Sequence, residues 1–189
     1  MVRGIQRHER FQIACGREFS KVGDFQSSNK KVSKAMVTEL ARLTAGIDPF
    51  TPVYVFKELA VNRVTKQSRR ADLVFYVPGS FIIYVEYKTT EVQQKCSHET
   101  QLRETQENII RNLSFRLSLI PPEAKSNNYL QVVTILVLRR FKSFKKQDDL
   151  ILCYPKQTNR VRDTVKCDDM ISLLGHMGTR ISPRMSRFL

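Results

Sequence analysis

The stretch from Arg69 to Lys88 reads RRADLVFYVPGSFIIYVEYK. Two runs rich in Val, Ile, Phe and Tyr stand on either side of a Pro-Gly-Ser segment. Such runs around a short turn that contains glycine predict a β-hairpin. If the hairpin is centred on Gly79, Asp72 on the first strand lies directly opposite Glu86 on the second. Directly opposed side chains in antiparallel strands are close neighbours.

The alternation of side chains along a strand divides this hairpin into two faces. One face is expected to carry Asp72, Val74, Tyr76, Ile82, Tyr84, Glu86 and Lys88. The other is expected to carry Leu73, Phe75, Val77, Phe81, Ile83, Val85 and Tyr87. Both faces are mostly apolar, so helices should cover both of them. Two carboxylates and a lysine then gather at one end of the hairpin.

This pair of carboxylates predicts a metal site. Close carboxylates repel each other, and burial adds a desolvation cost, which a divalent cation offsets. Oxygen ligands suit Mg²⁺ or Mn²⁺, so Asp72 and Glu86 are the candidate metal ligands. Such an ion polarises a phosphodiester and activates a water, and Lys88 completes the candidate catalytic set by orienting that water or stabilising the phosphate.

Two alternatives to the metal site stay open. The same residues, together with Arg69 and Arg70, also fit a surface cluster of ion pairs. A slip of one residue in the strand pairing would moreover place Asp72 and Glu86 on opposite faces.

The rest of the chain predicts an α/β fold with a mixed central sheet, a β-hairpin, a crossover helix and flanking helices. Apolar spacing predicts helices within residues 1–26 and over 31–45, 99–120 and 168–174. Strands are expected over 53–56, 129–138 and 148–154. The order strand, helix, strand from residue 81 to 138 predicts a right-handed crossover between parallel strands.

Composition limits the classes of function. The chain has 189 residues and a formal charge of +14, which favours anionic partners such as nucleic acid. Its longest apolar run, 132–138, is too short for a membrane helix, and no secretory signal is expected at the amino terminus. Four cysteines stand far apart and are expected to be reduced. We expect a single domain over 1–175 and a loose basic tail over 176–189.

The motif segment resembles the PD-(D/E)XK nuclease superfamily. More narrowly, the chain is similar to the herpesvirus core nuclear protein family that is encoded beside the thymidine kinase gene. The family pattern has a basic pair that leads to Asp, an apolar hairpin and an E-x-K-T ending. Here these parts read Arg69-Arg70-Ala71-Asp72 and Glu86-Tyr87-Lys88-Thr89. The similarity includes His8-x-Arg10-Phe11 and Leu119-Ile120-Pro121-Pro122, and it covers residues 8 to 156.

The resemblance implies a protein of the host nucleus and nucleolus, with the host cytoplasm as a further location. It also implies disturbed nucleoli, cell-cycle arrest, and host nucleolar or cell-cycle proteins as partners. Two functions stay open. One is a metal-dependent endonuclease that uses Mg²⁺ or Mn²⁺, and the other is a catalytically inactive nuclease-fold module that acts through host proteins.

The chain departs from the family pattern at two positions. Ala71 stands where the superfamily has Pro, which supplies no chemistry. Arg63 stands where family members often carry an acidic residue on the preceding strand. Glu58 and Glu39 are the candidate substitutes for that acidic residue.

Several basic residues are candidates for nucleic-acid binding: Arg69, Arg70, Arg139, Arg140, Lys142, Lys145 and Lys146. The group from 139 to 146 also contains Phe141 and Phe144, which could stack on bases. We favour a solvated turn whose phenylalanines pack inward. The same stretch also fits a nuclear import signal.

Overall fold

The computed structural model describes residues 6, 9–13, 15, 19–26, 32, 34–61, 70–88, 95–143, 146–154, 160–162 and 164–177. The helices are η1 (Val22–Phe25), α2 (Lys34–Leu43), α3 (Lys95–Ser118), η3 (Pro122–Ala124) and α4 (Cys167–Met177). The long strands are β1 (Tyr54–Ala60), β2 (Arg70–Val77), β3 (Phe81–Lys88), β5 (Leu130–Ser143) and β6 (Lys146–Tyr154). The short strands are β4 (Lys125–Ser126), β7 (Arg160–Val161) and β8 (Thr164–Val165).

The central sheet has the strand order β1-β2-β3-β5-β6, and β7 pairs with the start of β5. Neighbouring strands are antiparallel except β3 and β5, which are parallel and joined through α3. The short strands β4 and β8 form a second, two-stranded sheet. This arrangement confirms the predicted α/β fold with a mixed sheet, a hairpin and a crossover helix.

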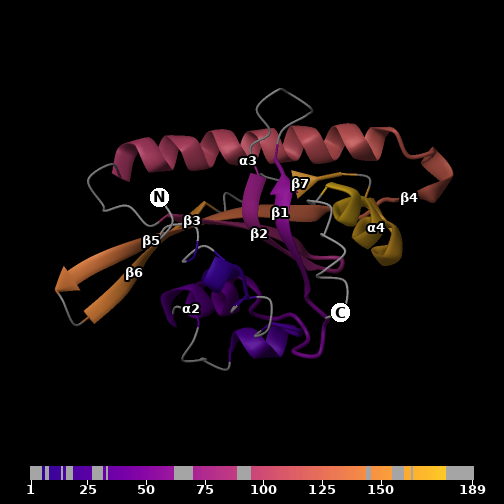
Figure 1. The fold of residues 1–189 in the computed structure, drawn as a ribbon. Helices are drawn as coiled ribbons and strands as arrows, with labels where there is room; N and C mark the ends of the chain where they lie inside the picture. Colours follow the sequence, from indigo (N-terminus) through magenta and orange to yellow (C-terminus); the bar gives the residue numbers. More distant parts are fainter. Residues whose placement is uncertain are drawn as a thin grey trace.

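Helices lie on both faces of the sheet, with α3 and α4 on one side and α2 on the other (Figure 1). Val74, Tyr76, Ile82 and Tyr84 are buried with residues of α3 and α4. Leu73, Phe75, Val77, Ile83, Val85 and Tyr87 are buried with residues of α2 and of the N-terminal part of the chain. These two groups confirm the predicted faces of the hairpin over its apolar part.

The β2–β3 hairpin has the predicted register over its apolar part, but the predicted pairing of Asp72 directly opposite Glu86 is wrong, because the pairing of the two strands ends before these residues. Val77 pairs with Phe81, and the pairing continues without a slip to Leu73 and Val85. Gly79 in the turn has φ +68, a left-handed conformation that residues with a side chain rarely adopt. The Pro-Gly-Ser turn therefore fixes the register, as the sequence predicts.

Two predictions of local structure need correction. The turn predicted from residue 139 is wrong over 139–143, because these residues continue β5 and pair with β6. The strand predicted at 53–56 is longer, since β1 reaches Ala60 through its pairing with β2.

Cys167 is a free thiol. Within the described ranges, no helix has the length and apolar character needed to cross a membrane. Residues 178–189, most of the predicted tail, lie outside the described residues, and the division into domain and tail stays a prediction.

Candidate cation site

The candidate site lies where the central sheet divides. Between β2 and β3, the backbone pairing ends at Leu73 and Val85. Beyond this point β2 stays paired with β1 as far as Arg70, and β3 stays paired with β5 as far as Lys88. The two inner strands therefore separate while each keeps its outer neighbour, and Asp72 and Glu86 are the first residues on the two sides of the division.

Asp72 links the two strands at this point through its side chain. It is only 6% exposed, and its Oδ2 accepts a hydrogen bond of 2.7 Å from the Tyr87 N–H. A backbone donor on β3 is thus satisfied by a carboxylate of β2 in place of a backbone carbonyl. This bond holds the Asp72 carboxylate against the main chain one residue after Glu86.

Glu86 and Lys88 form an ion pair on β3, with 2.5 Å between Glu86 Oε1 and Lys88 Nζ. Their register partners on β5 are Leu136 and Leu138, which pack together with Leu102 of α3. The Glu86 side chain is 28% exposed and the Lys88 side chain is 37% exposed. The pair matches the ion-pair alternative for these residues, and at this exposure it adds little to stability.

Glu58 on β1 lies at the same level as Asp72. The β1–β2 pairing joins Lys57 with Leu73 and Leu59 with Ala71, which places Glu58 at the register position of Asp72. Its carboxylate accepts a hydrogen bond of 2.7 Å from Gln12 Nε2. Glu58, a candidate substitute for the missing acidic residue of the family pattern, therefore lies beside Asp72 in the strand pairing.

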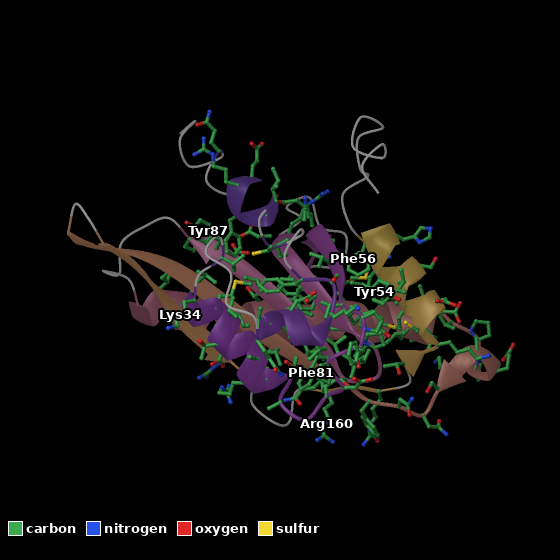
Figure 2. All side chains as sticks on the ribbon, turned by 90° about the horizontal axis from the view of Figure 1, so that it is seen from below. Lys34, Tyr54, Phe56, Phe81, Tyr87 and Arg160 are labelled. Carbon is green, nitrogen blue, oxygen red and sulfur yellow. The ribbon has the colours of Figure 1, made fainter. Side chains whose placement is uncertain are left out.

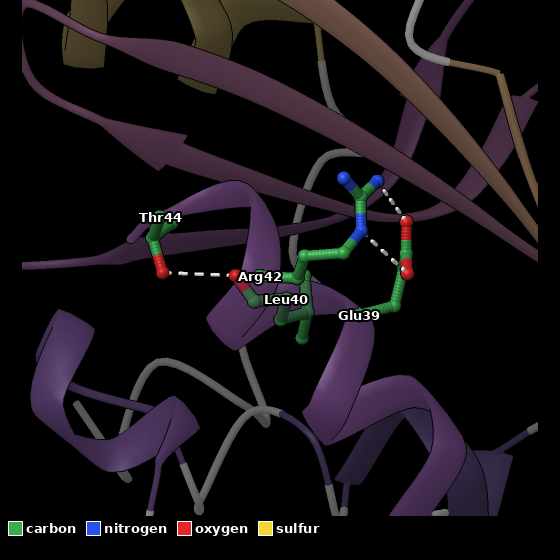
Figure 3. A network of polar contacts seen from close by, with 4 residues as sticks. All are labelled: Glu39, Leu40, Arg42 and Thr44. Atoms are coloured by element: carbon green, nitrogen blue, oxygen red, sulfur yellow. Dashed lines mark hydrogen bonds and ion pairs between the residues drawn. The ribbon is translucent and has the colours of Figure 1, made fainter. Parts of the chain in front are cut away.

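Glu39, the other candidate substitute, is engaged elsewhere. Arg42, one turn later on α2, holds both of its carboxylate oxygens at 2.6 and 3.1 Å (Figure 3). We therefore leave Glu39 out of the candidate site. Its ion pair with Arg42 lies within α2, separate from the candidate site.

Gln12 is a residue of the site that the sequence did not indicate. It is buried, and its side-chain amide donates both to Glu58 Oε1 and to the backbone oxygen of Asp72, at 3.0 Å. These partners lie 46 and 60 residues away in the sequence. A single glutamine in a polar helix carries no pattern that could have revealed such contacts.

Tyr84 is a further buried polar residue on β3, two positions before Glu86. Its hydroxyl finds no hydrogen-bond partner within the described part of the chain. Burial raises the pKa of this phenol well above its usual value, so Tyr84 stays neutral. Because the group is enclosed by the core, we assign it no chemical role.

The described residues contain no group of three or more His, Cys, Asp or Glu side chains that is arranged to hold a metal ion. A cation held by Asp72 and Glu86 would have at most these two carboxylates as ligands, and water would have to complete its coordination. Mg²⁺ and Mn²⁺ accept such a site, since Mg²⁺ usually retains several waters and binds through one or two carboxylates. A cation at Glu86 would share or displace the Lys88 contact.

Most of the predicted nucleic-acid-binding residues that the structure describes lie on the β5–β6 hairpin, and Arg70 lies on β2. Arg70 is exposed at the start of β2, whereas Arg69 and Lys145 lie outside the described residues. Lys142 lies near the end of β5 and Lys146 begins β6. Arg139 and Arg140 occupy β5 positions that pair with Asp149 and Asp148 of β6. Opposite charges at paired positions reduce the net charge that this hairpin offers to a phosphate backbone.

Comparisons with known proteins place the chain in no family. No family model, no curated protein and no solved structure matches it.

Proposed function

We propose that this chain is a herpesvirus-type nuclear and nucleolar protein with a PD-(D/E)XK-like core that binds Mg²⁺ or Mn²⁺ at Asp72 and Glu86. In this proposal the core binds or cleaves nucleic acid, and the protein disturbs nucleoli and cell-cycle progression in the host. The family resemblance supports the viral and nuclear parts of the proposal. The position of the motif residues supports the chemical part.

One observation carries the chemical proposal. The hairpin strands separate beyond Leu73 and Val85, so Asp72 and Glu86 stand on the two sides of a division in the sheet. The parallel β3–α3–β5 crossover follows directly, as in the order of elements that the resemblance implies. Within this core, a phosphate oxygen and a water would complete the coordination of the cation. Lys88 would then be released from Glu86 to orient the water or stabilise the phosphate.

The first test measures Mn²⁺ binding to the full chain by calorimetry. Asp72→Asn and Glu86→Gln each remove one negative charge with little change in shape. We expect each to weaken Mn²⁺ binding by at least about tenfold, because even the loss of a neighbour of a metal ligand costs that much. Glu39→Gln is the matched control, since it removes a glutamate from a comparable local ion pair with Arg42. Equal affinity in the two glutamate variants would contradict the site.

A second test asks whether the site is catalytic. Plasmid DNA and RNA are incubated with the protein and Mg²⁺ or Mn²⁺, beside the Asp72→Asn variant. Cleavage by the parent that disappears in the variant would support an endonuclease. Cleavage that persists unchanged in the variant would come from a contaminant and would remove the catalytic assignment.

The second candidate function is a nuclease-fold module without catalysis that acts through host nucleolar or cell-cycle proteins. The Glu86–Lys88 ion pair favours it, since the pair already neutralises one of the two carboxylates. Arg63 at the expected acidic position favours it as well. Under this alternative, Asp72→Asn leaves the effect on nucleoli intact in cells. Loss of that effect in a variant that is folded by circular dichroism would exclude the alternative.

A further inference from the structure

One end of the central sheet carries an exposed aromatic ring beside two arginines. Tyr129, the residue before β5, is 45% exposed. The guanidinium carbon of Arg162 lies over its ring, 5.4 Å from the centroid. Arg160 in β7 and Arg162 are both exposed. A ring and two cations therefore lie together at a surface that the proposed function does not use.

The strand pairing explains how β7 positions these side chains. Val161 pairs with Leu130, and both are buried in the cluster that contains residues of α3 and α4. Because side chains alternate along a strand, Arg160 lies on the opposite face of the sheet. There Arg160 pairs with Gln131, which in turn pairs with Phe81 of β3. The buried Val161 thus anchors β7, and the arginines on either side of it are left at the surface.

This surface is remote from the candidate cation site. Phe81 and Lys88 are the two ends of β3, so roughly 20 Å separate the Phe81–Gln131–Arg160 row from the Glu86–Lys88 pair. Figure 2 shows Arg160 near Phe81 and away from Tyr87, which marks the other end of the strand. Ligand binding at the arginines can therefore be measured independently of the cation site.

The two arginines suit phosphate groups. No carboxylate in the described part of the chain forms an ion pair with either of them, and the whole chain carries a formal charge of +14. A guanidinium binds phosphate through two parallel hydrogen bonds. Residues two apart on a strand are separated by about 6–7 Å, so Arg160 and Arg162 can contact different phosphates of one strand.

The exposed ring selects unpaired bases. A duplex hides the faces of its bases, whereas a single strand offers them for stacking on aromatic side chains and on arginine planes. The 45% exposure of Tyr129 leaves ring surface for a base, and the Arg162 guanidinium beside it extends the stacking area. An aromatic ring next to two cations matches the bases and phosphates of a single strand.

We infer that Tyr129, Arg160 and Arg162 form a binding surface for single-stranded nucleic acid. One base stacks on the Tyr129 ring, and the two arginines bind neighbouring phosphates. The inference goes beyond the proposed function, because this surface requires neither a cation nor Asp72 and Glu86. It gives the chain a contact for nucleic acid at the end of the sheet opposite to the cation site.

The first test measures the anisotropy of a fluorescent oligothymidine of about 12 nucleotides, a length within the site sizes of single-strand-binding folds. The full chain is used, in EDTA, so that no divalent cation takes part. Tyr129→Ala should weaken binding at least about fivefold, the loss of one stacked base. Tyr129→Phe keeps the ring and should change the affinity less than about twofold.

The same strand without bases separates stacking from charge. Parent and Tyr129→Ala should bind this abasic strand equally, because it offers nothing to stack on the ring. An equal loss on both strands in Tyr129→Ala would overturn the stacking role. No loss on oligothymidine would overturn it as well.

The arginines are tested through the salt dependence of binding. Arg160→Gln and Arg162→Gln should each lower the slope of log Kd against log salt concentration by about 0.7, the value for one phosphate contact with a single strand. Arg111→Gln is the matched control, because Arg111 is an exposed arginine of α3. It should leave the slope unchanged, and equal slopes in all three variants would overturn the phosphate contacts.

Phe50 provides the matched control for the ring. It is 76% exposed, and Lys21 Nζ lies 5.5 Å from its ring centroid, so it forms a similar pair of ring and cation. Phe50 precedes β1, and β2, β3 and β5 lie between β1 and β7. Phe50→Ala should leave the affinity for oligothymidine unchanged. A loss equal to that of Tyr129→Ala would mean that Tyr129 is not a specific contact.

The outcomes distinguish this inference from the proposed function. Asp72→Asn should bind oligothymidine in EDTA as the parent does, whatever its effect on Mn²⁺ binding. Tighter binding of a duplex of the same length than of the single strand would overturn the inference and leave the cation site untouched. Absence of binding by the parent would also overturn the inference alone.

Discussion

The two ends of the β2–β3 hairpin differ in the side chains they carry and in the pairing of their strands. At the turn end, the strands are fully paired, and Phe75, Val77, Ile82 and Ile83 are completely buried. At the other end the pairing stops, and Asp72, Glu86 and Lys88 replace apolar side chains. The comparison indicates that one end specifies the fold and the other holds polar groups at a cost in local regularity.

Covering elements differ between the two ends as well. Phe75 lies near the centre of β2 and meets the rings of Phe19 and Phe25 edge-on, at 5.7 and 5.9 Å. Around Asp72, the contacts are hydrogen bonds from Tyr87 and Gln12. Apolar packing tolerates no gap without a loss of stability, whereas a few directional bonds can hold a site in place. Mutations at the two ends should therefore affect different measurements.

The largest expected effect is on stability at the apolar end. Phe75→Ala should lower the free energy of unfolding by about 3–5 kcal/mol, because it leaves a cavity between two aromatic rings. Phe50→Ala is the matched control, since Phe50 is 76% exposed and should change stability by less than about 0.5 kcal/mol. Urea titration followed by circular dichroism measures both. Equal losses in the two variants would mean that Phe75 is not part of a packed core.

The next largest effect is expected for two substitutions of Asp72, which change stability and cation affinity to different extents. Asp72→Ala removes the acceptor of the Tyr87 N–H and should cost about 1–3 kcal/mol of unfolding free energy. Asp72→Asn retains an acceptor oxygen and should cost less than about 1 kcal/mol. Both variants should lose Mn²⁺ binding. If the two variants are equally stable, the Asp72–Tyr87 bond does not hold the strands in place.

The register, the faces and the crossover were all predictable from the sequence, because they follow from patterns between near neighbours. Alternation of side chains assigned Val74 and Phe75 to opposite faces, and the glycine turn set the pairing. The break in the pairing beyond Leu73 was not predictable, since the same alternation continues through Asp72. It coincides with the hydrogen bond from the Tyr87 N–H to the Asp72 carboxylate, a contact that only the folded chain brings about.

Two other features could not be predicted from the sequence: the backbone conformation of Glu58 and the strand that begins before Arg139 and continues through it. The positive φ of Glu58 is held by tertiary contacts, and nothing in the residue type favours it. The basic run from Arg139 looked like a solvated turn because charge was the visible pattern. It is a strand that pairs with β6, and Asp149 and Asp148 stand at the positions paired with Arg139 and Arg140. The pairing with β6 therefore determines the structure of this segment, although its composition favours a turn.

A smaller effect is expected at the turn itself. Gly79→Ala should cost about 1 kcal/mol, because φ +68 is unfavourable for alanine although no atom lies within 4 Å of the new methyl group. Gly175→Ala is the control within α4, where the space is also open and the left-handed conformation is absent. It should stabilise the protein by about 0.5–1 kcal/mol. Thermal unfolding of both variants checks the opposite signs, and the same sign in both would refute the role of the turn.

The smallest effect lies between the two ends, at two buried tyrosines on the same face of the hairpin. Tyr84→Phe removes a hydroxyl without a partner among the described residues, so the free energy of unfolding should stay unchanged or rise by less than about 1 kcal/mol. Tyr76→Phe is the control, because the Tyr76 hydroxyl interacts with Cys167 and with the Gly79 backbone and its loss should destabilise.

At alkaline pH the stabilities of the parent and of Tyr84→Phe should differ further. Burial raises the pKa of Tyr84 above the ordinary value of 10.0 in the folded chain, so its neutral form is favoured there. The associated stability is fully present below pH 10.0 and is lost as the pH rises further, because only the unfolded chain can then ionise this tyrosine. Tyr84→Phe should therefore lose less stability than the parent above that pH, as urea titrations at neutral and alkaline pH would show. An equal loss of unfolding free energy in the parent and the variant would mean that the Tyr84 hydroxyl reaches solvent. The apolar layer between the sheet and α3 would then extend less far toward Glu86 than in the structure.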